Sequence, residues 1–125
     1  MQAAAPRDPD PLIWLAHAAA VAPTLRLGTC ILIVPQRNPL VLAKELATLD
    51  VLSGGRVELG LGVGWMKEEF DAYDVPFRGR GKRMDEQLPI IQKLLAGEVV
   101  SADLDRPGVD AHEPDDGAER RRLVS

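Results

Sequence analysis

Several features that mark other classes of protein are scarce in this chain of 125 residues. Cys30 is the only cysteine, so no disulfide can form within the chain, and a cytoplasmic location is the default expectation. The sequence has no run of about 18 apolar residues, the pattern typical of a transmembrane helix. The first ten residues, MQAAAPRDPD, lack the basic and apolar regions of a signal peptide. These absences favour a soluble cytoplasmic protein.

Basic charge is not in excess either. The formal net charge is −4, which gives no electrostatic basis for binding nucleic acid or an anionic membrane, so neither is expected as a partner. The three arginines at 120–122 stand among many acids and are interpreted as part of a solvated tail. His17 has no second ligand or acid at helical spacing, so we predict no metal site and a histidine at or near the surface.

The first half of the chain predicts a helix, a strand and a second helix. An aspartate and a proline at 10–11 are typical of a helix start, and Pro23 should end that helix. A nearly continuous apolar run over residues 25–34 is typical of a parallel strand covered on both faces. The second helix should begin at the asparagine and proline at 38–39 and end at the Ser-Gly-Gly of 53–55.

The second half continues the alternation. It predicts a strand over 56–63, one helical turn over 66–72 and a helix over 82–96, in which Pro89 should cause a kink or shift the helix start. Strands that alternate with amphipathic helices indicate parallel βαβ units of an α/β fold. Ligands of such folds bind at the carboxyl ends of the strands, so PQRN and GVGWMKEEF should lie on one functional rim.

The chain is expected to divide into three segments. Residues 1–10 form a leader or loop, and residues 11–97 form the globular part. Residues 98–125 lack apolar periodicity and are rich in acids, which predicts a divergent, disordered tail.

The glycine-rich segment GLGVGW differs from the known nucleotide-binding loops. The dinucleotide fingerprint would need its third glycine where Trp65 stands, and no P-loop Lys-Ser or Lys-Thr pair is present. Glycines at 60, 62 and 64 clear one face of the strand end, which suits either a flat ring system or close packing of strand against helix. The residues alone leave these two alternatives open.

Residues 27–86 resemble the luciferase-like monooxygenase superfamily, and most closely its oxidoreductases that use coenzyme F420. The motifs are GT-x-(apolar)4-PQRNP, LA-x-(E/Q)LATLDVLSGGR, GVGW-x-x-EEF and RG-x-R-x-DE. The resemblance implies a (β/α)8 barrel that binds FMN or coenzyme F420 at its carboxyl rim, for hydride transfer or monooxygenation. A complete barrel needs about 250 residues. The chain is therefore expected to be a fragment, from helix 2 to helix 4 of that barrel, and to be partly folded or aggregation-prone when isolated.

The resemblance also implies which residues contact the cofactor. In the family the matching strand ends in a bulge with a non-prolyl cis peptide against the ring, which falls here at Cys30 and Ile31. Gly62, Val63 and Gly64 match the strand end beside the cofactor. Trp65 would either line the pocket or pack at the helix–strand junction. The implied cofactor-binding residues are Thr29, Cys30, Ile31, Gly62, Val63, Gly64 and Trp65. No catalytic residue is assigned.

Two positions bear on the cofactor and the substrate. Some flavin-binding members have an arginine at the position of Val63 that pairs with the FMN phosphate, and its absence favours coenzyme F420 over FMN. Some sugar-phosphate-oxidising members have a catalytic glutamate where Trp65 stands, so that substrate class is not expected. We expect an F420-dependent oxidoreductase acting on a small organic molecule, with an FMN-dependent monooxygenase and a non-catalytic remnant as alternatives. Homo-oligomerisation is one way to cover the exposed apolar faces.

The remaining polar side chains of these motifs are expected to stabilise the fold rather than to contact substrate. Most lie at helix ends or in loops, where side chains commonly cap backbone groups. They are Arg37 and Asn38 at a helix start, Asp50 and Arg56 around the SGGR turn, Glu68 and Glu69 in a solvated helical turn, and Arg80, Arg83 and Asp85 as a loop-anchoring group.

Overall fold

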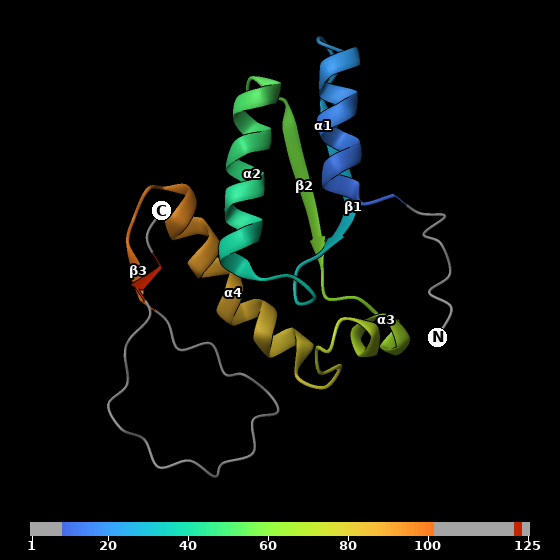
Figure 1. Cartoon of the computed structure of the whole chain (residues 1–125), viewed down its shortest axis with the longest axis vertical. Helices are drawn as coiled ribbons and strands as arrows, with labels where there is room; N and C mark the ends of the chain where they lie inside the picture. The colour runs from blue at the N-terminus through green and yellow to red at the C-terminus, as the bar shows by residue number, and fades with distance from the viewer. Residues whose placement is uncertain (1–8, 102–121, 124–125) are drawn as a thin grey trace.

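A computed structural model of the chain describes residues 9–101 and 122–123 (Figure 1). Its elements in chain order are α1 (Pro11–Val21), β1 (Leu27–Ile33), α2 (Pro39–Ser53), β2 (Val57–Gly62), α3 (Lys67–Ala72), α4 (Arg80–Leu95), β3 (Val100–Ser101) and β4 (Arg122–Leu123). β1 and β2 are parallel neighbours joined through α2, which confirms the predicted βαβ unit. Within the described ranges, no helix is long and apolar enough to cross a membrane.

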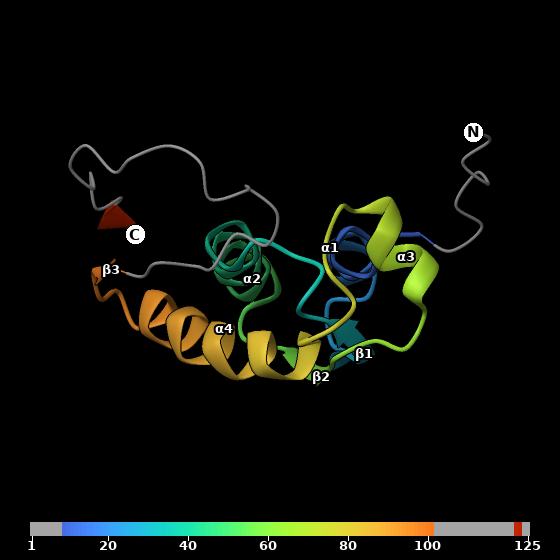
Figure 2. The ribbon, with the colours of Figure 1, turned by 90° about the horizontal axis from the view of Figure 1, so that it is seen from below.

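Two of the helices form a layer on one face of the strand pair. α1 and α2 lie on the same side of β1 and β2, as Figure 2 shows, and α4 packs against α2. β3 pairs antiparallel with β4 in a separate two-stranded sheet. The predicted disordered tail lies mostly outside the described residues, so its state stays a prediction.

Local side-chain chemistry explains where the first two helices begin. Asp10 Oδ1 accepts hydrogen bonds from the amides of Leu12 and Ile13 at 2.9 and 3.1 Å. Asn38 Oδ1 caps α2 in the same way, with amide distances of 2.9 and 3.2 Å. Gly54 ends α2 in the left-handed region at a φ of 66°. These starts and this end agree with the sequence-based expectation.

α4 differs from its expected bounds. It begins at Arg80, before the predicted residue 82, and continues through Pro89 without interruption. Pro89 was expected to kink the helix or to shift its start; the helix does not start after the proline, and the kink stays a prediction. Tertiary packing offsets the missing backbone hydrogen bond, because the residues that follow Pro89 are buried in the core.

One apolar core lies between the strands and the helices. Each fully buried aliphatic side chain in it contributes roughly 1.5–3 kcal/mol to folding. Its buried members are Leu12, Leu15, Leu32, Val34, Leu42, Ala43, Leu46, Leu49, Ile90, Ile91, Leu94 and Val100. Val100 extends this core beyond residue 97, and the proposed segment boundary there stays a prediction.

β1 is not covered on both faces, which corrects the expectation from its apolar run. Leu32 is buried, whereas Gly28, Cys30 and Ile31 are exposed. On β2, Glu58 is exposed as well. α1 and α2 cover one face of the strand pair, so the side chains that point the other way remain open in the described structure.

Arg56 links the end of α2 to two segments far from it in the sequence, the end of α1 and the residues before β1. Its Nε donates to the Ser53 carbonyl at 2.6 Å, and its Nη1 donates to the carbonyls of Ala22 and Leu25 at 2.6 and 2.8 Å. Its Nη2 donates to the Ala19 carbonyl at 2.8 Å. The predicted structural role of Arg56 is confirmed, but its partners are backbone carbonyls of Ser53 and of residues 19–25 rather than Asp50.

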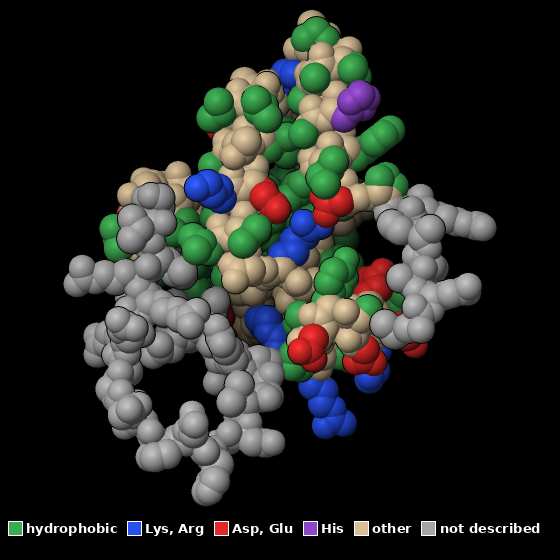
Figure 3. All heavy atoms as spheres, viewed as in Figure 1, with side chains coloured by type: hydrophobic (Ala, Val, Ile, Leu, Met, Phe, Trp, Pro, Cys, Tyr) green, Lys and Arg blue, Asp and Glu red, His purple; other side chains and the backbone are tan. Residues whose placement is uncertain are grey.

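Charged side chains meet in the furrow between α1 and α2 (Figure 3). Arg37 Nη2 lies 2.7 Å from Asp10 Oδ2, and Arg37 Nη1 lies 3.8 Å from Glu45 Oε2. Burial raises the pKa of Asp10. The opposing effects are larger in sum: a hydrogen bond from Arg37, the charge of Arg37, and hydrogen bonds from the amides of Ile13 and Leu12. Together they hold the pKa of Asp10 below its ordinary 3.8. Arg37 thus links the loop after β1 to the start of α1.

This lowered pKa predicts a specific loss of stability in acid. A carboxylate whose pKa is lower in the folded chain adds stability above its unfolded pKa, and this stability is lost as the pH falls below about 3.8 through the folded value. Asp10→Asn keeps the helix cap and removes the ion pair, so its stability deficit relative to the parent chain should shrink below that pH. Urea denaturation of both chains between pH 7 and pH 2.5 measures this difference, and a deficit that stays constant in acid would contradict it.

Candidate cofactor-binding rim

The carboxyl end of β1 contains a bulge. Thr29 pairs with Leu59 and Leu32 pairs with Leu61, so β1 has one more residue than β2 between these pairs. The Cys30–Ile31 peptide bond within the bulge is cis. Both features agree with what the sequence resemblance implied at this position.

Gly60 of β2 faces the start of this bulge. The Thr29 hydroxyl donates to the Gly60 carbonyl at 2.8 Å, which links the two strands through a side chain. A Cβ atom on Gly60 would overlap the Thr29 carbonyl oxygen. Close approach of the two backbones therefore requires glycine at this position.

Ile31 lies over the end of β2. A Cβ atom on Gly62 would overlap the Ile31 side chain, so the missing side chain of Gly62 makes room for Ile31. Ile31 is nevertheless 49% exposed, and the neighbouring Cys30 is exposed too. The bulge thus presents apolar surface on the face of the strands that α1 and α2 leave open.

Gly64 is fixed in place just after β2. Its φ of 78° lies in the left-handed region, and a Cβ there would come within 2.9 Å of Ile33 and 3.0 Å of Phe70. Arg80 Nε donates to the Gly64 carbonyl at 2.8 Å, and the Arg80 guanidinium carbon lies 3.9 Å from the centroid of the Phe77 ring. This arrangement holds the exit of β2 against α3 and the start of α4.

Sequence reasoning missed Phe70, which is fully buried and packs edge-to-face against Phe77 at a centroid distance of 5.4 Å. A phenylalanine flanked on both sides by acidic residues in the segment KEEFDAY was the available signal. Arg83 donates to the Pro76 carbonyl at 3.0 Å, so two of the three expected loop anchors make such bonds. Asp85, the third, is exposed.

The last two implied contacts, Val63 and Trp65, are both exposed. The Trp65 side chain is 78% exposed, which is inconsistent with packing at the helix–strand junction. Phe70 fills that junction instead. Trp65 is therefore available as surface, while Gly60, Gly62 and Gly64 each make room for close packing within the chain.

The strand ends of this rim offer mainly apolar contact surface. Its exposed side chains are mainly apolar, and the Thr29 hydroxyl is already hydrogen-bonded to Gly60. Among the residues with described positions, no three His, Cys, Asp or Glu side chains are grouped to hold a metal ion. An apolar edge with alternate glycines can support a flat ring.

A family model described as luciferase-like monooxygenase matches residues 2–114. This chain belongs to the luciferase-like monooxygenase family. One relative in this family is the uncharacterized protein Rv0953c of Mycobacterium tuberculosis, 38% identical over 92 residues. The match covers 74% of this chain and 33% of that relative, so the luciferase-like chain spans about a third of its relative's length.

Solved structures of longer luciferase-like monooxygenases contain the same arrangement of strands and helices. Monooxygenase RslO1 of Streptomyces bottropensis is 35% identical with a TM-score of 0.71, and the match covers 77% of this chain and 29% of RslO1. A second structure, solved with FMN, is the oxygenating constituent of 3,6-diketocamphane monooxygenase of Pseudomonas putida. It is 22% identical with a TM-score of 0.71, and the match covers 78% of this chain and 28% of that one. The predicted α/β fold, part of a (β/α)8 barrel, is confirmed.

Proposed function

We propose that this luciferase-like chain supplies one wall of a flavin-type cofactor site in an oxidoreductase. The observation that carries the proposal is the bulge at Cys30–Ile31, which lies beside the glycine-rich end of β2 on the open face of the strands. The carboxyl ends of parallel barrel strands are where such folds bind ligands. The fit is one of shape and apolar contact.

Each rim residue has a distinct part in this proposal. Ile31 and Val63 give apolar contact to one face of the ring and exclude water there. Thr29, hydrogen-bonded to Gly60, fixes the strand end that carries Cys30. Trp65 is exposed and free to close over the cofactor edge. The bound ring would supply the redox chemistry, and these residues would bind and orient it.

Coenzyme F420 is the proposed cofactor. Val63 occupies the position where some flavin-binding family members have an arginine for the FMN phosphate, and this favours the deazaflavin. FMN is the second candidate. The Pseudomonas putida structure was solved with FMN, and RslO1, at 35% identity, is a monooxygenase, so an FMN-dependent monooxygenation has equal support.

The other functional assignments follow from the family and the composition. We propose a small organic substrate, a cytoplasmic location, and no binding to nucleic acid or membranes. A homo-oligomer is proposed as the way to cover exposed apolar side chains such as Val51.

Fluorescence titration of the full chain with coenzyme F420 and with FMN tests the proposal. Saturable binding of coenzyme F420 supports the first candidate, and saturable binding of FMN alone supports the second. Ile31→Asp places a charge on the proposed ring contact and should weaken binding of either cofactor by about tenfold or more.

Ile13→Asp is the matched control, because Ile13 is 74% exposed on α1 and belongs to no part of the rim. Its affinity for the cofactors should equal that of the parent chain. If neither cofactor binds to a chain whose circular dichroism shows the helices in place, the proposed function is wrong, and the non-catalytic remnant is the better description.

A further inference from the structure

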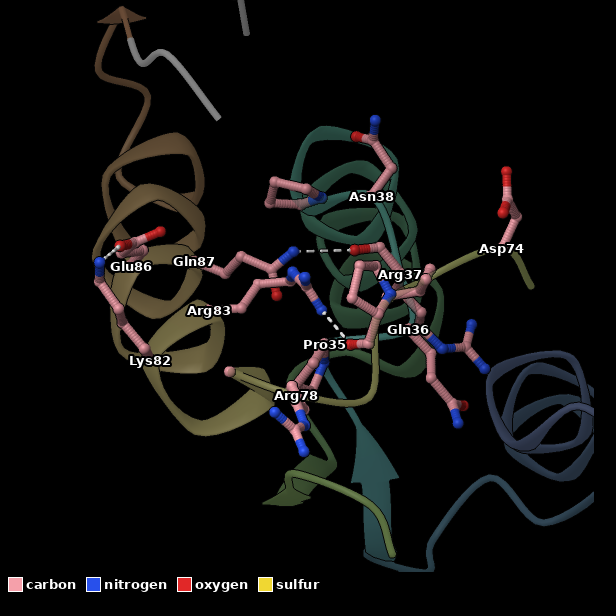
Figure 4. Close-up of a pocket in the computed structure, with 14 residues that line it drawn as sticks. Pro35, Gln36, Arg37, Asn38, Asp74, Arg78, Lys82, Arg83, Glu86 and Gln87 are labelled. Carbon is pink, nitrogen blue, oxygen red and sulfur yellow. Dashed lines mark hydrogen bonds and ion pairs between the residues drawn. The ribbon is translucent and has the colours of Figure 1, made fainter. Parts of the chain in front are cut away.

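A cavity lies on the same rim but outside the proposed cofactor contacts (Figure 4). It has a volume of about 480 Å³ and is bounded by the loop at 35–39, the segment at 74–79 and the first turns of α4. We call it the basic cleft, because Arg78, Lys82 and Arg83 line it together with Asp74 and Glu86, whereas the Arg37 guanidinium pairs with Asp10 and Glu45. None of the seven implied cofactor residues lines it.

Gln87 provides an unsatisfied polar atom at this cleft. The side chain lines the cleft and is 4% exposed, and its Nε2 donates to the Arg37 carbonyl at 3.1 Å. This bond fixes the amide orientation, because only the NH₂ group can donate. Gln87 Oε1 has no hydrogen-bond partner in the described part of the chain. Buried side-chain oxygens are almost always paired with a protein group or an ordered water, so this atom needs a donor from outside the chain.

The start of α4 adds a site for negative charge. α4 begins after Gly79 with no side-chain cap, so its first amides lack the partner that Asp10 and Asn38 give the other long helices. Such a helix start favours an anion, and it opens onto the cleft at Gly79.

Two cations are available beside this helix start. Arg78 is exposed and forms no ion pair within the described ranges. Lys82 is close to Glu86 only at 3.8 Å, with its side chain 82% exposed. In Figure 4 Arg78 lies below the cleft, and Lys82 lies on the outer side of α4, where a dashed line joins it to Glu86.

We propose that the basic cleft binds a small organic phosphate that carries a hydroxyl group. The phosphate lies beside Arg78, Lys82 and the first amides of α4, where charge-assisted hydrogen bonds can form. The hydroxyl donates to Gln87 Oε1, directly or through one ordered water. This site is separate from the ring contacts at Ile31 and does not depend on the proposed redox function.

Calorimetric titration of the full chain, without any flavin, tests this assignment. The probes are glycerol 3-phosphate, propyl phosphate, which lacks a free hydroxyl, and inorganic phosphate. Glycerol 3-phosphate should bind most tightly, and its affinity should fall as salt is added. Equal affinity for glycerol 3-phosphate and propyl phosphate would overturn the role of Gln87, and no binding of any phosphate would overturn the site.

Four variants divide the site into its parts. Lys82→Met should weaken binding of glycerol 3-phosphate by about tenfold, as the loss of one charge-assisted contact. Glu86→Gln removes a negative charge from the cleft and should strengthen binding. Gln87→Met should abolish the preference for glycerol 3-phosphate over propyl phosphate. Lys93→Met, in the last turn of the same helix, should leave every affinity unchanged.

Two results would refute the proposal even if the Gln87 variant failed to fold. The first is equal affinity in the Lys82→Met and Lys93→Met variants, since both lysines are on α4 and only Lys82 lines the cleft. The second is displacement of bound FMN or coenzyme F420 by glycerol 3-phosphate, which would make the basic cleft a part of the cofactor site. Binding that is sensitive to Lys82 and independent of flavin supports it.

Discussion

Gly60→Ala is expected to destabilise the chain by about 2–3 kcal/mol and to remove cofactor binding. The added Cβ would overlap the Thr29 carbonyl oxygen, a backbone atom that cannot rotate away as a flexible side chain would. β1 and β2 would have to separate at the bulge, and the hydrogen bond from the Thr29 hydroxyl to the Gly60 carbonyl would be lost with that movement. Urea denaturation measures the stability, and the fluorescence titration measures the binding.

Gly81→Ala is the matched control for this substitution. Gly81 lies in α4, and no atom lies within 4 Å of the position that its Cβ would occupy. Alanine is favoured over glycine within a helix, so the variant should be more stable by up to about 1 kcal/mol. If Gly60→Ala and Gly81→Ala were equally stable and bound the cofactors equally well, the close approach of β2 to the bulge would contribute to neither stability nor cofactor binding, and the prediction would be wrong.

Arg56→Leu is expected to lower the free energy of unfolding by about 3 kcal/mol. The guanidinium donates to carbonyls at the end of α1, before β1 and at the end of α2, so its removal leaves four acceptors without their partner. Several of these carbonyls are partly buried, and water can replace the lost donors only in part. The loss should appear in urea denaturation and as faster amide exchange in the last turn of α1.

Arg56→Lys separates the geometry of this contact from its charge. A lysine keeps the positive charge but cannot reach all four carbonyls with one ammonium group, whereas the planar guanidinium does. We expect it to recover about half of the stability that the leucine variant loses. Equal stability of the lysine and leucine variants would show that only the full guanidinium contact contributes. A leucine variant as stable as the parent chain would contradict the stabilising role assigned to Arg56.

The helix starts and the βαβ topology could be predicted because their causes are local in the sequence. Asp10 and Asn38 each act on amides two and three residues away, and Gly54 ends α2 through its own backbone freedom. The bulge at Cys30–Ile31 was predicted from a resemblance, since composition alone does not place a bulge.

Features that depend on distant segments could not be predicted. Three of the four acceptors of Arg56 are carbonyls at the end of α1 and just before β1, and no sequence pattern joins them to Arg56. The exposure of Ile31 depends on which face of β1 the helices cover, which an apolar run does not reveal. The roles of Gly60 and Gly62 became clear only from the atoms opposite them.

The most direct measurement of the central claim is a residue-resolved amide NMR titration of the full chain with coenzyme F420 and with FMN. The claim is that a flavin-type ring binds where the bulge of β1 meets the end of β2. The account predicts that the largest shift changes fall at 29–31 and 62–65, with Lys93 and the last turn of α4 unchanged. Saturable shift changes confined to α1 or α4, or a dispersed spectrum that neither cofactor alters, would contradict it.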